Sequence, residues 1–437
     1  MGARQTALNV LIACRRAGAW SNGILKEYLV RDKLDRREAA LATRLSYGVL
    51  QNRLLLDFYL KQLLAGKVKD LHPVVRDILH LGLYQMYMMD KIPASAAVNE
   101  SVQLAKQYSR RQRNAPGLVN AVLRNADRSR EVIAQPDALD VRYSHPRALV
   151  DLLGEYVGQA RLEPMLRANN DIPATVVQAN TLKTTAQELQ IVLEQEGVAA
   201  EKHPWLSECL VLSGTGSLEQ LESFQKGLYY VQDAAAKLSV LCGEIKPNWQ
   251  VLDSCAAPGG KSFAAAMAMG STGKIISCDI HPHKVELIGK GAARLGLSNI
   301  QAICQDAADY RPEWQEKMDA VIADVPCSGY GIIRKKPDIR YKSPESMLQL
   351  PQLQLQILQN QANYVKPGGL LLYSTCTLVR AENEAVVAAF LEEHKEFTVE
   401  ALPGIPPFSE SSSGMLTLVP GQYDTDGFFI CRLRKSL

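Results

Sequence analysis

The sequence predicts a multi-domain chain that ends in an α/β domain with a mostly parallel sheet. Its length of 437 residues exceeds that of one ordinary domain. Apolar residues recur at helical spacing in the front of the chain, whereas buried strand patterns alternate with amphipathic helix patterns from Trp249 onward. We therefore expect an all-α helical domain over 1–140, a small α+β subdomain over 141–245, and the α/β domain over 246–437.

Four stretches at the front of the chain carry the helical pattern. They are residues 7–29, 72–89, 96–112 and 117–130. Pro73 suits the first turn of the second stretch. Residues 133–146 break the pattern and predict a linker. Arginines gather toward the end of this region, at Arg110, Arg111, Arg113, Arg124, Arg128 and Arg130.

The middle of the chain mixes both kinds of element. Strands are predicted over 173–180, 209–214 and 228–233, and a helix over 185–197 that ends at Gly197. These short elements indicate an α+β subdomain.

From Trp249 on, strand, turn and helix repeat. The repeat predicts a parallel sheet with helices on both faces, whose ligands bind beyond the carboxyl ends of the strands. The strand candidates lie in "WQVLDSCAAPGGKSFAAAMAMG", "KIISCDIHPHKVELIGKGAARLG", "IQAICQDAADY", "MDAVIADVPCSG" and "GGLLLYSTCT", with the second expected to end at Asp279 and the third at Asp306. Polar and unusual residues cluster at the ends of these strands, where we expect the functional site.

Composition and charge narrow the class of protein. Hydrophobic residues make up 47% of the chain and charged residues 22%, and no apolar run reaches the ~18 residues that span a membrane, so a cytoplasmic protein without membrane contact is expected. Residues 1–145 hold 23 Lys and Arg against 13 Asp and Glu, a net +10, which leaves −7 for the rest. That asymmetry fits either a polyanionic partner such as nucleic acid or a solubilising helical surface.

The nine cysteines do not form pairs with Cys-x-x-Cys spacing, so the sequence suggests neither a zinc site nor a disulfide framework. No metal is expected. In a reduced compartment, a cysteine that matters is reactive rather than bridged.

The loop after the first strand of the repeat has the features of a cofactor site. "DSCAAPGGK" places Gly259 and Gly260 at a strand-to-helix turn, where a ligand can approach the backbone. The pattern is neither the dinucleotide fingerprint nor a Walker loop. Asp279 ends the next strand, about 20 residues on, where a carboxylate can bind ribose hydroxyls. Asp306 ends the third strand and can meet an adenine amino group, so an adenosine-bearing cofactor fits.

The fourth and fifth strands end in cysteines. Asp324 and Cys327 close the fourth strand, and Cys376 closes the fifth. A lone cysteine at a strand end is most often a small buried residue, but two of them beside a carboxylate predict a reactive pair. The cations that follow the fourth strand, Arg334, Lys335, Lys336 and Arg340, could hold phosphates.

At this point the chain resembles the S-adenosylmethionine-dependent RNA 5-methylcytosine methyltransferases. The resemblance rests on "CAAPGGK", "DVPCSGYG", and "STCT" followed by "ENE". "AVNESVQLAK" and "GLVNAVLR" in the front part are similar to the RNA-binding fold of the antitermination factor NusB. Together they resemble bacterial 16S ribosomal RNA methyltransferases of the Sun/Fmu type, over essentially the whole chain. The resemblance implies a NusB-like helical domain, a Rossmann-like methyltransferase domain, and a monomer.

The resemblance also implies a role for each site residue. Cys376 matches the nucleophile that attacks carbon 6 of a cytosine, Cys327 the thiol that assists product release, and Asp324 an acid at the base. The cofactor would be S-adenosyl-L-methionine, and the substrate a specific cytosine of 16S ribosomal RNA. The positions that match cofactor contacts are Cys255, Ala256, Ala257, Pro258, Gly259, Gly260, Lys261, Asp279, Asp306 and Asp324.

Two other functions remain open on the sequence. A methyltransferase of the same type could act on transfer RNA or on another ribosomal site, which would change only the substrate. A non-catalytic RNA-binding assembly factor could keep the cofactor fold, although intact Cys376, Asp324 and Gly259-Gly260 argue against it. A thiol protease would need a histidine near its cysteine, and neither cysteine motif contains one.

Overall fold

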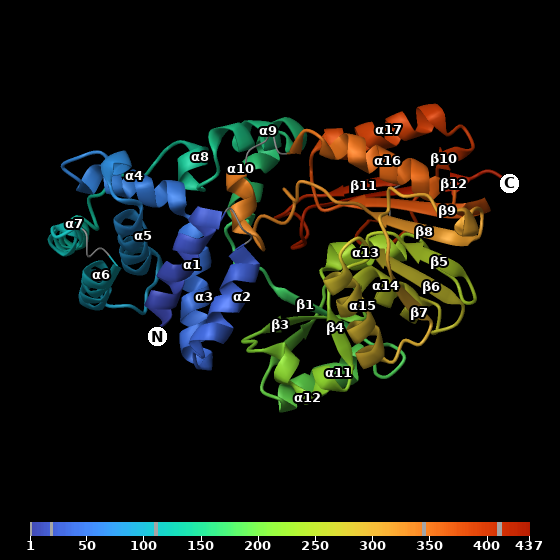
Figure 1. Cartoon of the computed structure of the whole chain (residues 1–437), viewed down its shortest axis with the longest axis horizontal. Coiled ribbons are helices and arrows are strands. Elements are labelled where there is room, and N and C mark those ends of the chain that lie inside the picture. Colours follow the sequence, from blue (N-terminus) through green and yellow to red (C-terminus); the bar gives the residue numbers. More distant parts are fainter. Residues whose placement is uncertain (1, 18–20, 109–111, 343–346, 409–412) are drawn as a thin grey trace. The chain divides into compact units, whose positions relative to one another are not determined.

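The computed structural model describes residues 2–17, 21–108, 112–342, 347–408 and 413–437. The chain divides into two compact units (Figure 1). Unit 1 comprises Met1–Asp171 and Ile333–Lys342, and unit 2 comprises Ile172–Ile332 and Ser343–Leu437. None of the helices that the structure describes is long and apolar enough to cross a membrane.

Unit 1 is helical throughout. Its helices are α1 (Ala3–Ala17), α2 (Ser21–Asp32), α3 (Arg36–Gln51), α4 (Arg53–Leu63), α5 (Pro73–Met88), α6 (Ala94–Tyr108), α7 (Ala115–Arg128), α8 (Leu139–Arg142), α9 (Arg147–Val157) and α10 (Gln159–Ala168), with 3₁₀ turns η1 (Val68–Asp70) and η4 (Pro337–Tyr341). Asp35 caps α3 by accepting from the amide of Glu38, and Pro73 opens α5 as predicted. The first predicted helix is two helices, α1 and α2.

The segment predicted as a linker is packed rather than loose. Ser144 and His145 have no exposed surface, and the Ser144 hydroxyl accepts a hydrogen bond of 2.7 Å from the amide of Leu54. Burial and the charge of Arg340 lower the pKa of His145, so this imidazole is neutral. The segment is thus anchored in unit 1 by Ser144 and His145, whereas Gln135, Asp137 and Arg142 remain exposed.

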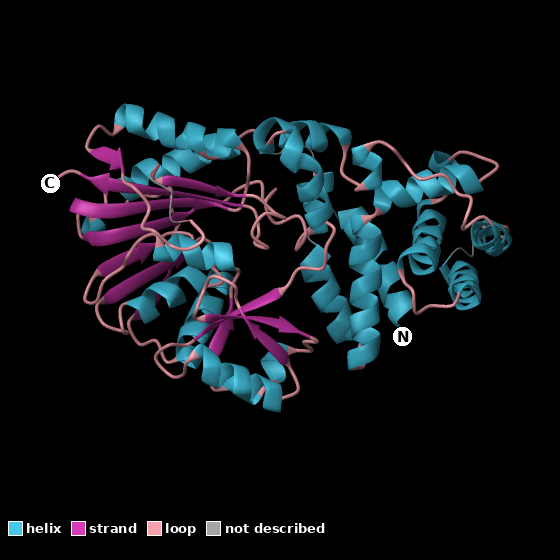
Figure 2. Ribbon diagram, turned by 180° about the vertical axis from the view of Figure 1, so that it is seen from behind, coloured by secondary structure: helices cyan, strands magenta, loops and turns pink. Residues whose placement is uncertain are grey.

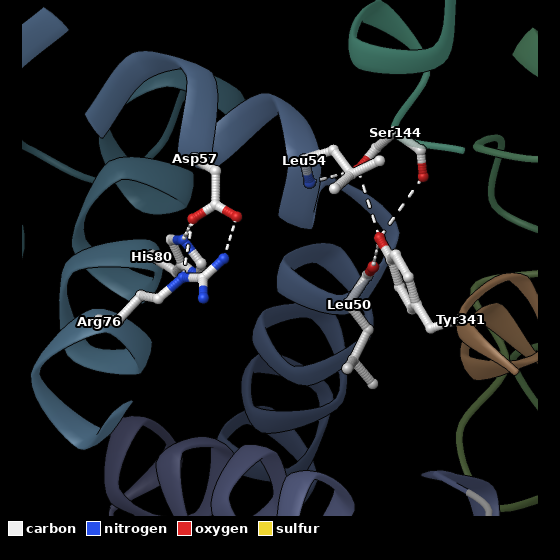
Figure 3. Close-up of polar contacts among 7 residues, drawn as sticks. All are labelled: Leu50, Leu54, Asp57, Arg76, His80, Ser144 and Tyr341. Carbon is white, nitrogen blue, oxygen red and sulfur yellow. Dashed lines mark hydrogen bonds and ion pairs between the residues drawn. The ribbon is translucent and has the colours of Figure 1, made fainter. Parts of the chain in front are cut away.

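A buried ion cluster joins α4 to α5 (Figure 3). Asp57 accepts a hydrogen bond from Arg76 Nε at 2.8 Å, a second bond from Arg76 Nη2, and contacts His80 Nε2 at 2.9 Å. Burial alone would raise the pKa of Asp57, but the hydrogen bonds from His80 and Arg76 outweigh it and lower that pKa to about 2. The cluster therefore stabilises unit 1 through a carboxylate that stays ionised.

Unit 2 begins with a small antiparallel sheet of order β2-β3-β1-β4. Its strands are β1 (Thr175–Ala179), β2 (Ala199–Lys202), β3 (Cys209–Ser213) and β4 (Tyr229–Val231), and its helices are α11 (Ala186–Gln195) and α12 (Glu222–Gln225), with η2 (Leu218–Gln220). β1, β3, β4 and α11 lie where the sequence predicts them, whereas the edge strand β2 was not predicted because three of its four residues are exposed.

The second sheet of unit 2 carries the candidate site. Its strand order is β10-β12-β9-β8-β5-β6-β7, with β11 paired to β12. The strands are β5 (Gln250–Asp253), β6 (Lys274–Asp279), β7 (Ile300–Cys304), β8 (Met318–Asp324), β9 (Val365–Thr375), β10 (Phe397–Val399), β11 (Met415–Leu418) and β12 (Phe428–Lys435). The five strands from β5 to β9 are mutually parallel, and β10, β11 and β12 add an antiparallel edge. The predicted fold class is confirmed, and the antiparallel edge is an addition to it.

Helices cover both faces of this sheet (Figure 2). Successive residues such as Val321 and Ile322 point into the two different cores. One core includes α16 (Leu350–Ala362) and α17 (Glu384–Glu393), and the other includes α13 (Ala234–Leu241), α14 (Gly260–Ala268) and α15 (Pro282–Leu295). The 3₁₀ turns η3 (Pro312–Trp314) and η6 (Arg380–Glu382) complete the unit.

The Asp57 cluster predicts a specific pH dependence of stability. Asp57→Asn should destabilise unit 1 by about 2 kcal/mol at neutral pH, because the folded-state pKa of Asp57 lies below its unfolded value. That contribution is present above pH ~4 and disappears as the pH falls toward about 2. Calorimetric melting of wild type and variant between these pH values measures the difference.

Asp151→Asn is the control, because Asp151 forms an exposed pair with Arg147 and should change the melting temperature little at any pH. If the difference in melting temperature between wild type and Asp57→Asn stayed constant down to the lowest pH, Asp57 would not be the ionised centre of this cluster.

Candidate active site

All of the predicted site residues lie at or just beyond the carboxyl ends of five adjacent parallel strands. Asp279 and Asp324 are the last residues of β6 and β8, and Cys376 directly follows β9. The loop 254–261 follows β5, and Asp306 follows β7 by two residues. Because the strands are parallel, these ends share one edge of the sheet, as the sequence predicts.

The loop after β5 turns sharply into α14. Gly259 is the residue before the helix and has φ of 113°, a conformation that suits glycine. A Cβ at this position would also lie 2.4 Å from the ring of Phe263. The amide of Ala256 donates to the carbonyl of Cys278 at 2.7 Å and so joins the loop to β6. Glycine is therefore required at position 259 both by the backbone conformation and by the Phe263 ring that packs against it.

Each of the two acids that follow this loop has one oxygen committed to the protein. Asp279 Oδ1 accepts from the amide of His281 at 3.0 Å, and Lys284 Nζ lies 3.7 Å from it. Asp306 Oδ1 accepts from the amide of Ala308 at 2.9 Å. The second carboxylate oxygen of each acid has no hydrogen bond to any residue that the structure describes, so both can bind a ligand.

A small pocket lies beside Asp306. Its lining comes from the ends of β5, β6 and β7 and from aromatic side chains, and includes Leu252, Ser254, Cys278, Asp306, Trp314 and Tyr364. Polar side chains share this lining with the aromatic and aliphatic ones, and Gln305, Asp309 and Gln361 belong to it as well.

Asp253 lies under the loop as a buried acid. Its Oδ2 accepts from the Ser262 hydroxyl at 2.7 Å, and Ser262 in turn accepts from Ser277 at 2.7 Å, whereas Oδ1 has no partner among the described residues. Burial raises the pKa of Asp253 to about 7, and the hydrogen bond from Ser262 opposes that rise. Burial is also the main cause that raises the pKa of the Cys255 thiol, so Cys255 is not a nucleophile.

Asp324 is held by two donors from neighbouring strand ends. Lys261 Nζ donates to Oδ2 at 2.6 Å, and the Ser374 hydroxyl donates to Oδ1 at 2.7 Å. The Lys261 side chain is only 10% exposed and that of Asp324 is 28% exposed. The pair therefore joins the cofactor loop, the end of β8 and the end of β9 at one carboxylate.

The two cysteines lie in contact beside this carboxylate. Cys327 Sγ and Cys376 Sγ are 3.0 Å apart, and the backbone amide of Cys376 donates to Cys327 Sγ at 3.2 Å. The hydrogen bond to Cys376 is the largest cause that raises the pKa of Cys327 well above that of an ordinary thiol, and burial adds to it. The two sulfurs are thus within hydrogen-bond reach of each other, and their contact together with burial favours the protonated form of Cys327.

Glu382, the last residue of η6, and Asn383, which follows it, hold the two segments that carry Cys327 and Cys376. Glu382 is 3% exposed and accepts from the amide of Ser328 and from Gln354 Nε2, each at 2.9 Å. Asn383 accepts from the Thr375 hydroxyl at 2.6 Å. The loop after β8 and the end of β9 are therefore braced by the same short segment.

Sequence reasoning missed several of these supporting residues. Ser374, Glu382 and Asn383 had no predicted role, although they lie in the "STCT" and "ENE" stretches that carry the resemblance. Lys261 was predicted as a cofactor contact, and in the structure its amine is bonded to Asp324.

The prediction that Arg334 and Arg340 hold phosphates is wrong. Their side chains are buried, with 5% and 1% exposure, because unit 1 encloses this segment. Of the arginines near the end of the helical region, Arg110 and Arg111 lie outside the described residues. Across the described ranges, no group of three or more His, Cys, Asp or Glu side chains is placed to hold a metal ion.

Comparison with known proteins agrees with a methyltransferase that carries a helical domain of the NusB type. Residues 240–434 match the family model "16S rRNA methyltransferase RsmB/F", and residues 1–128 match that of the NusB family. Residues 145–219 match the "Methyltr_RsmF/B-like, ferredoxin-like domain". Over 99% of its length the chain is 38% identical to the "Probable ribosomal RNA small subunit methyltransferase B" of Bacillus subtilis, covering 98% of that protein.

The chain belongs to the RsmB/F family of methyltransferases. The "Ribosomal RNA small subunit methyltransferase B" of Vibrio cholerae is 33% identical, with 92% of this chain and 90% of that protein covered. Among solved structures, that of PH0851 has a TM-score of 0.81 at 26% identity and covers 99% of both chains. A "Methyltransferase Homolog Protein" from Pyrococcus horikoshii has a TM-score of 0.58 at 26% identity and covers 68% of this chain and 97% of its own.

The thiol pair predicts an order of chemical reactivity. With limiting iodoacetamide near pH ~8, Cys376 should be alkylated about tenfold or more faster than Cys327, because the raised pKa of Cys327 depletes its thiolate. Peptide mapping by mass spectrometry measures both rates. The exposed Cys304 reports the reactivity of the reagent in the same sample.

The variant Cys376→Ser tests whether contact with the Cys376 thiol is what raises the pKa of Cys327. It replaces the thiol that raises the pKa of Cys327 with a neutral hydroxyl, so alkylation of Cys327 should become faster. Preferential labelling of Cys327 in the wild type would contradict this assignment of the proton.

Proposed function

We propose that this chain methylates carbon 5 of a cytosine in small-subunit ribosomal RNA through a covalent adduct with Cys376. The observation that carries the proposal is the pair of thiols, 3.0 Å apart, next to the Asp324 carboxylate that Lys261 and Ser374 hold. A single thiol at a strand end would be unremarkable as a core residue, but this arrangement has a nucleophile, a proton donor and an acid–base pair at one strand edge.

Covalent catalysis answers a specific chemical need. Carbon 5 of cytosine is too weak a nucleophile to take a methyl group directly. Addition of the Cys376 thiolate to carbon 6 makes the ring an enamine, with electron density at carbon 5. Cys376 suits this step because its neighbour Cys327 keeps its own proton and stabilises negative charge on the Cys376 sulfur by a hydrogen bond.

We assign the Lys261–Asp324 pair to ring nitrogen 3, on the edge of the cytosine away from carbon 6. Thiolate addition shifts negative charge from carbon 5 toward ring nitrogen 3 and the carbonyl oxygen on carbon 2. The pair offers a carboxylate acceptor and an ammonium donor at the end of β8, and a hydrogen bond or proton given to nitrogen 3 stabilises this charge. Ser374 keeps the carboxylate oriented through its other oxygen.

Product release reverses the addition. A base removes the proton from carbon 5, the carbon 5–carbon 6 double bond forms, and the bond from carbon 6 to the Cys376 sulfur breaks. The departing sulfur takes the bonding electron pair as a thiolate. Cys327 is placed to donate a hydrogen bond to that sulfur, which supports its role in release.

The residues at the other strand ends fit S-adenosyl-L-methionine, the methyl donor that we propose. The free oxygen of Asp279 can accept from ribose hydroxyls, the free oxygen of Asp306 can accept from an adenine amino group, and the glycine turn leaves the loop backbone approachable. This cofactor supplies a methyl group on a sulfonium sulfur. The loop Cys255–Lys261 and both acids would bind and orient it beside Asp324.

The RNA substrate is supported by the helical unit and by the relatives. Residues 1–145 carry a net charge of +10, which favours a polyanion, and residues 1–128 match the NusB family. The two relatives described above are both named as small-subunit ribosomal RNA methyltransferases. The target cytosine would have to leave its stack to reach Cys376.

Substitution of each cysteine tests the mechanism. Cys376→Ala should abolish methyl transfer to 16S ribosomal RNA, because no thiolate remains to activate carbon 5. Cys327→Ala should accumulate a covalent protein–RNA adduct, because elimination loses the donor that stabilises the departing sulfur. Labelled cofactor and denaturing gel electrophoresis measure transfer and adduct together.

Cys304→Ala is the control, because Cys304 is exposed at the end of β7 and outside the thiol pair, and it should change neither result. Adduct formation by Cys376→Ala, and not by Cys327→Ala, would reverse the two roles. Full transfer by Cys376→Ala would refute the covalent route.

The cofactor assignment makes a separate prediction. Asp279→Asn keeps an acceptor for the amide of His281 but replaces the free oxygen by an amide group that cannot accept from ribose. Binding of S-adenosyl-L-methionine, measured by titration calorimetry, should weaken about 10- to 100-fold, the range for a lost hydrogen bond to a charged group.

Glu286→Gln is the control. Glu286 lies on α15, the helix that follows Asp279, and forms an exposed ion pair with Lys290. Unchanged binding by Asp279→Asn would remove Asp279 from the cofactor site.

A further inference from the structure

The ten-residue segment Ile333–Lys342 comes from the methyltransferase part of the sequence but folds as part of unit 1. It lies between β8 and α16, and Cys327 precedes it by only six residues. Its residues Pro337–Tyr341 form the 3₁₀ turn η4. The chain thus leaves unit 2 just after its catalytic motif, enters unit 1, and returns.

Arg340 fixes this segment in unit 1. Its guanidinium, 1% exposed, donates from Nη1 to the carbonyl of Gln51 at 2.8 Å and to Asn170 Oδ1 at 2.9 Å. Further bonds go to the carbonyls of Ser144 and Asn169, both at 3.2 Å. No carboxylate bonds this guanidinium within the described chain. Carbonyl and amide oxygens accept from Nη1 and Nη2, whereas Nε has no partner among the described residues.

The position of those oxygens explains how a cation can be buried there. Gln51 is the last residue of α3, Asn169 follows the end of α10, and Tyr143, whose carbonyl lies 3.4 Å from Nη1, follows α8. The carboxyl end of a helix carries partial negative charge and unpaired carbonyls. Burial lowers the pKa of Arg340 to about 10, which still leaves it cationic at neutral pH.

Tyr341 adds a second attachment (Figure 3). Its hydroxyl donates to the carbonyl of Leu50 at 2.9 Å and lies 3.3 Å from the Ser144 hydroxyl. Ser144 in turn accepts from the amide of Leu54. The segment is therefore bonded both to the end of α3 and to the start of α4.

The other end of the same stretch is fixed to the backbone of the nucleophile. The amide of Gly331 donates to the carbonyl of Cys376 at 2.9 Å, and the Gly331 carbonyl accepts from the amide of Gly427 at 2.8 Å. A Cβ on Gly331 would lie 2.1 Å from the Gly427 carbonyl, so this approach requires glycine. Two residues after Gly331 the chain is already in unit 1.

We propose that Arg340 and Tyr341 are positioning residues that couple unit 1 to the two cysteines. They hold residues 333–342 in unit 1, and this hold keeps Gly331 on the carbonyl of Cys376 and the loop of Cys327 in register with it. The inference rests on the proposed function in assuming that unit 1 binds the RNA whose cytosine Cys376 attacks.

A guanidinium suits this role better than an apolar residue of the same size. An apolar side chain would avoid the desolvation cost of a buried charge, but it would leave the carbonyls of Gln51 and Asn169 without this donor. Carbonyl groups from several helix ends accept a planar donor in only one orientation. Arg340 therefore fixes the position and orientation of the segment within unit 1, whereas an apolar residue would only keep it buried.

Amide hydrogen exchange and kinetics of Arg340→Met test the coupling. Exchange at Gly331, measured without RNA or cofactor, should become about tenfold or more faster, because the bond to Cys376 opens more often. Under saturating RNA and cofactor, kcat for methyl transfer should fall by about tenfold, since small misplacement of reacting groups has effects of this order. The Kd for S-adenosyl-L-methionine should stay within about twofold, because Arg340 and Tyr341 bond to unit 1 and not to the acids that we propose to bind the cofactor.

Three variants accompany it. Arg340→Lys keeps the cation and should restore part of both kcat and Gly331 protection. Arg147→Met removes an exposed arginine of unit 1 and should leave both unchanged. Tyr341→Phe removes only the hydroxyl, and should show the same changes as Arg340→Met at smaller size; it carries the test alone if Arg340→Met does not fold.

The exchange measurement separates this inference from the proposed function. Absence of RNA methylation by the wild type would refute the proposed function and leave the exchange test in force. Faster exchange confined to residues 333–342 and the end of α3, with Gly331 and kcat as in the wild type, would overturn the coupling and make Arg340 a local packing residue.

Discussion

The ion pair between Lys261 and Asp324 is the interaction on which the geometry of the site depends. Lys261 lies on the loop after β5, Asp324 ends β8, and Ser374 of β9 bonds the second carboxylate oxygen, so three neighbouring strand ends meet at one group. Lys261 is nearly buried, and loss of one partner would leave an uncompensated charge at a cost of about 3 kcal/mol or more. The same pair therefore holds the ends of these three strands together at one carboxylate.

The two thiols are held against each other by hydrogen bonds. The backbone amide of Cys376 donates to Cys327 Sγ, and the two sulfurs lie 3.0 Å apart. Their contact is the largest cause that raises the pKa of Cys327. Glu382 and Asn383 brace the backbones that carry this pair, which explains why acidic and amide residues follow the fifth strand so closely. The position of Cys376 thus depends on bonds to residues other than its partner thiol.

The sequence was sufficient for the parts of the site that follow from local pattern. Buried parallel strands show as apolar runs, and their ends place Asp279, Asp306, Asp324 and Cys376 on one edge without any knowledge of contacts. Arg340 could not be predicted, because a cation in a basic stretch looks exposed until the distant ends of α3 and α10 are brought to it. Arg432 in β12 is a similar case, since its burial depends on Glu244 and Glu400 from elsewhere in the chain. Burial of charge is a property of tertiary structure, and local charge patterns do not reveal it.

Nucleoside analysis of the product tests the central claim most directly. The purified protein is incubated with unmodified 16S ribosomal RNA and methyl-labelled S-adenosyl-L-methionine, and the RNA is digested and resolved by liquid chromatography and mass spectrometry. Attack by Cys376 on carbon 6 directs the methyl group to carbon 5, so all of the label should elute as 5-methylcytidine. Label in a ribose-methylated nucleoside or on the exocyclic nitrogen of cytidine would contradict the account, because neither reaction uses a thiol adduct.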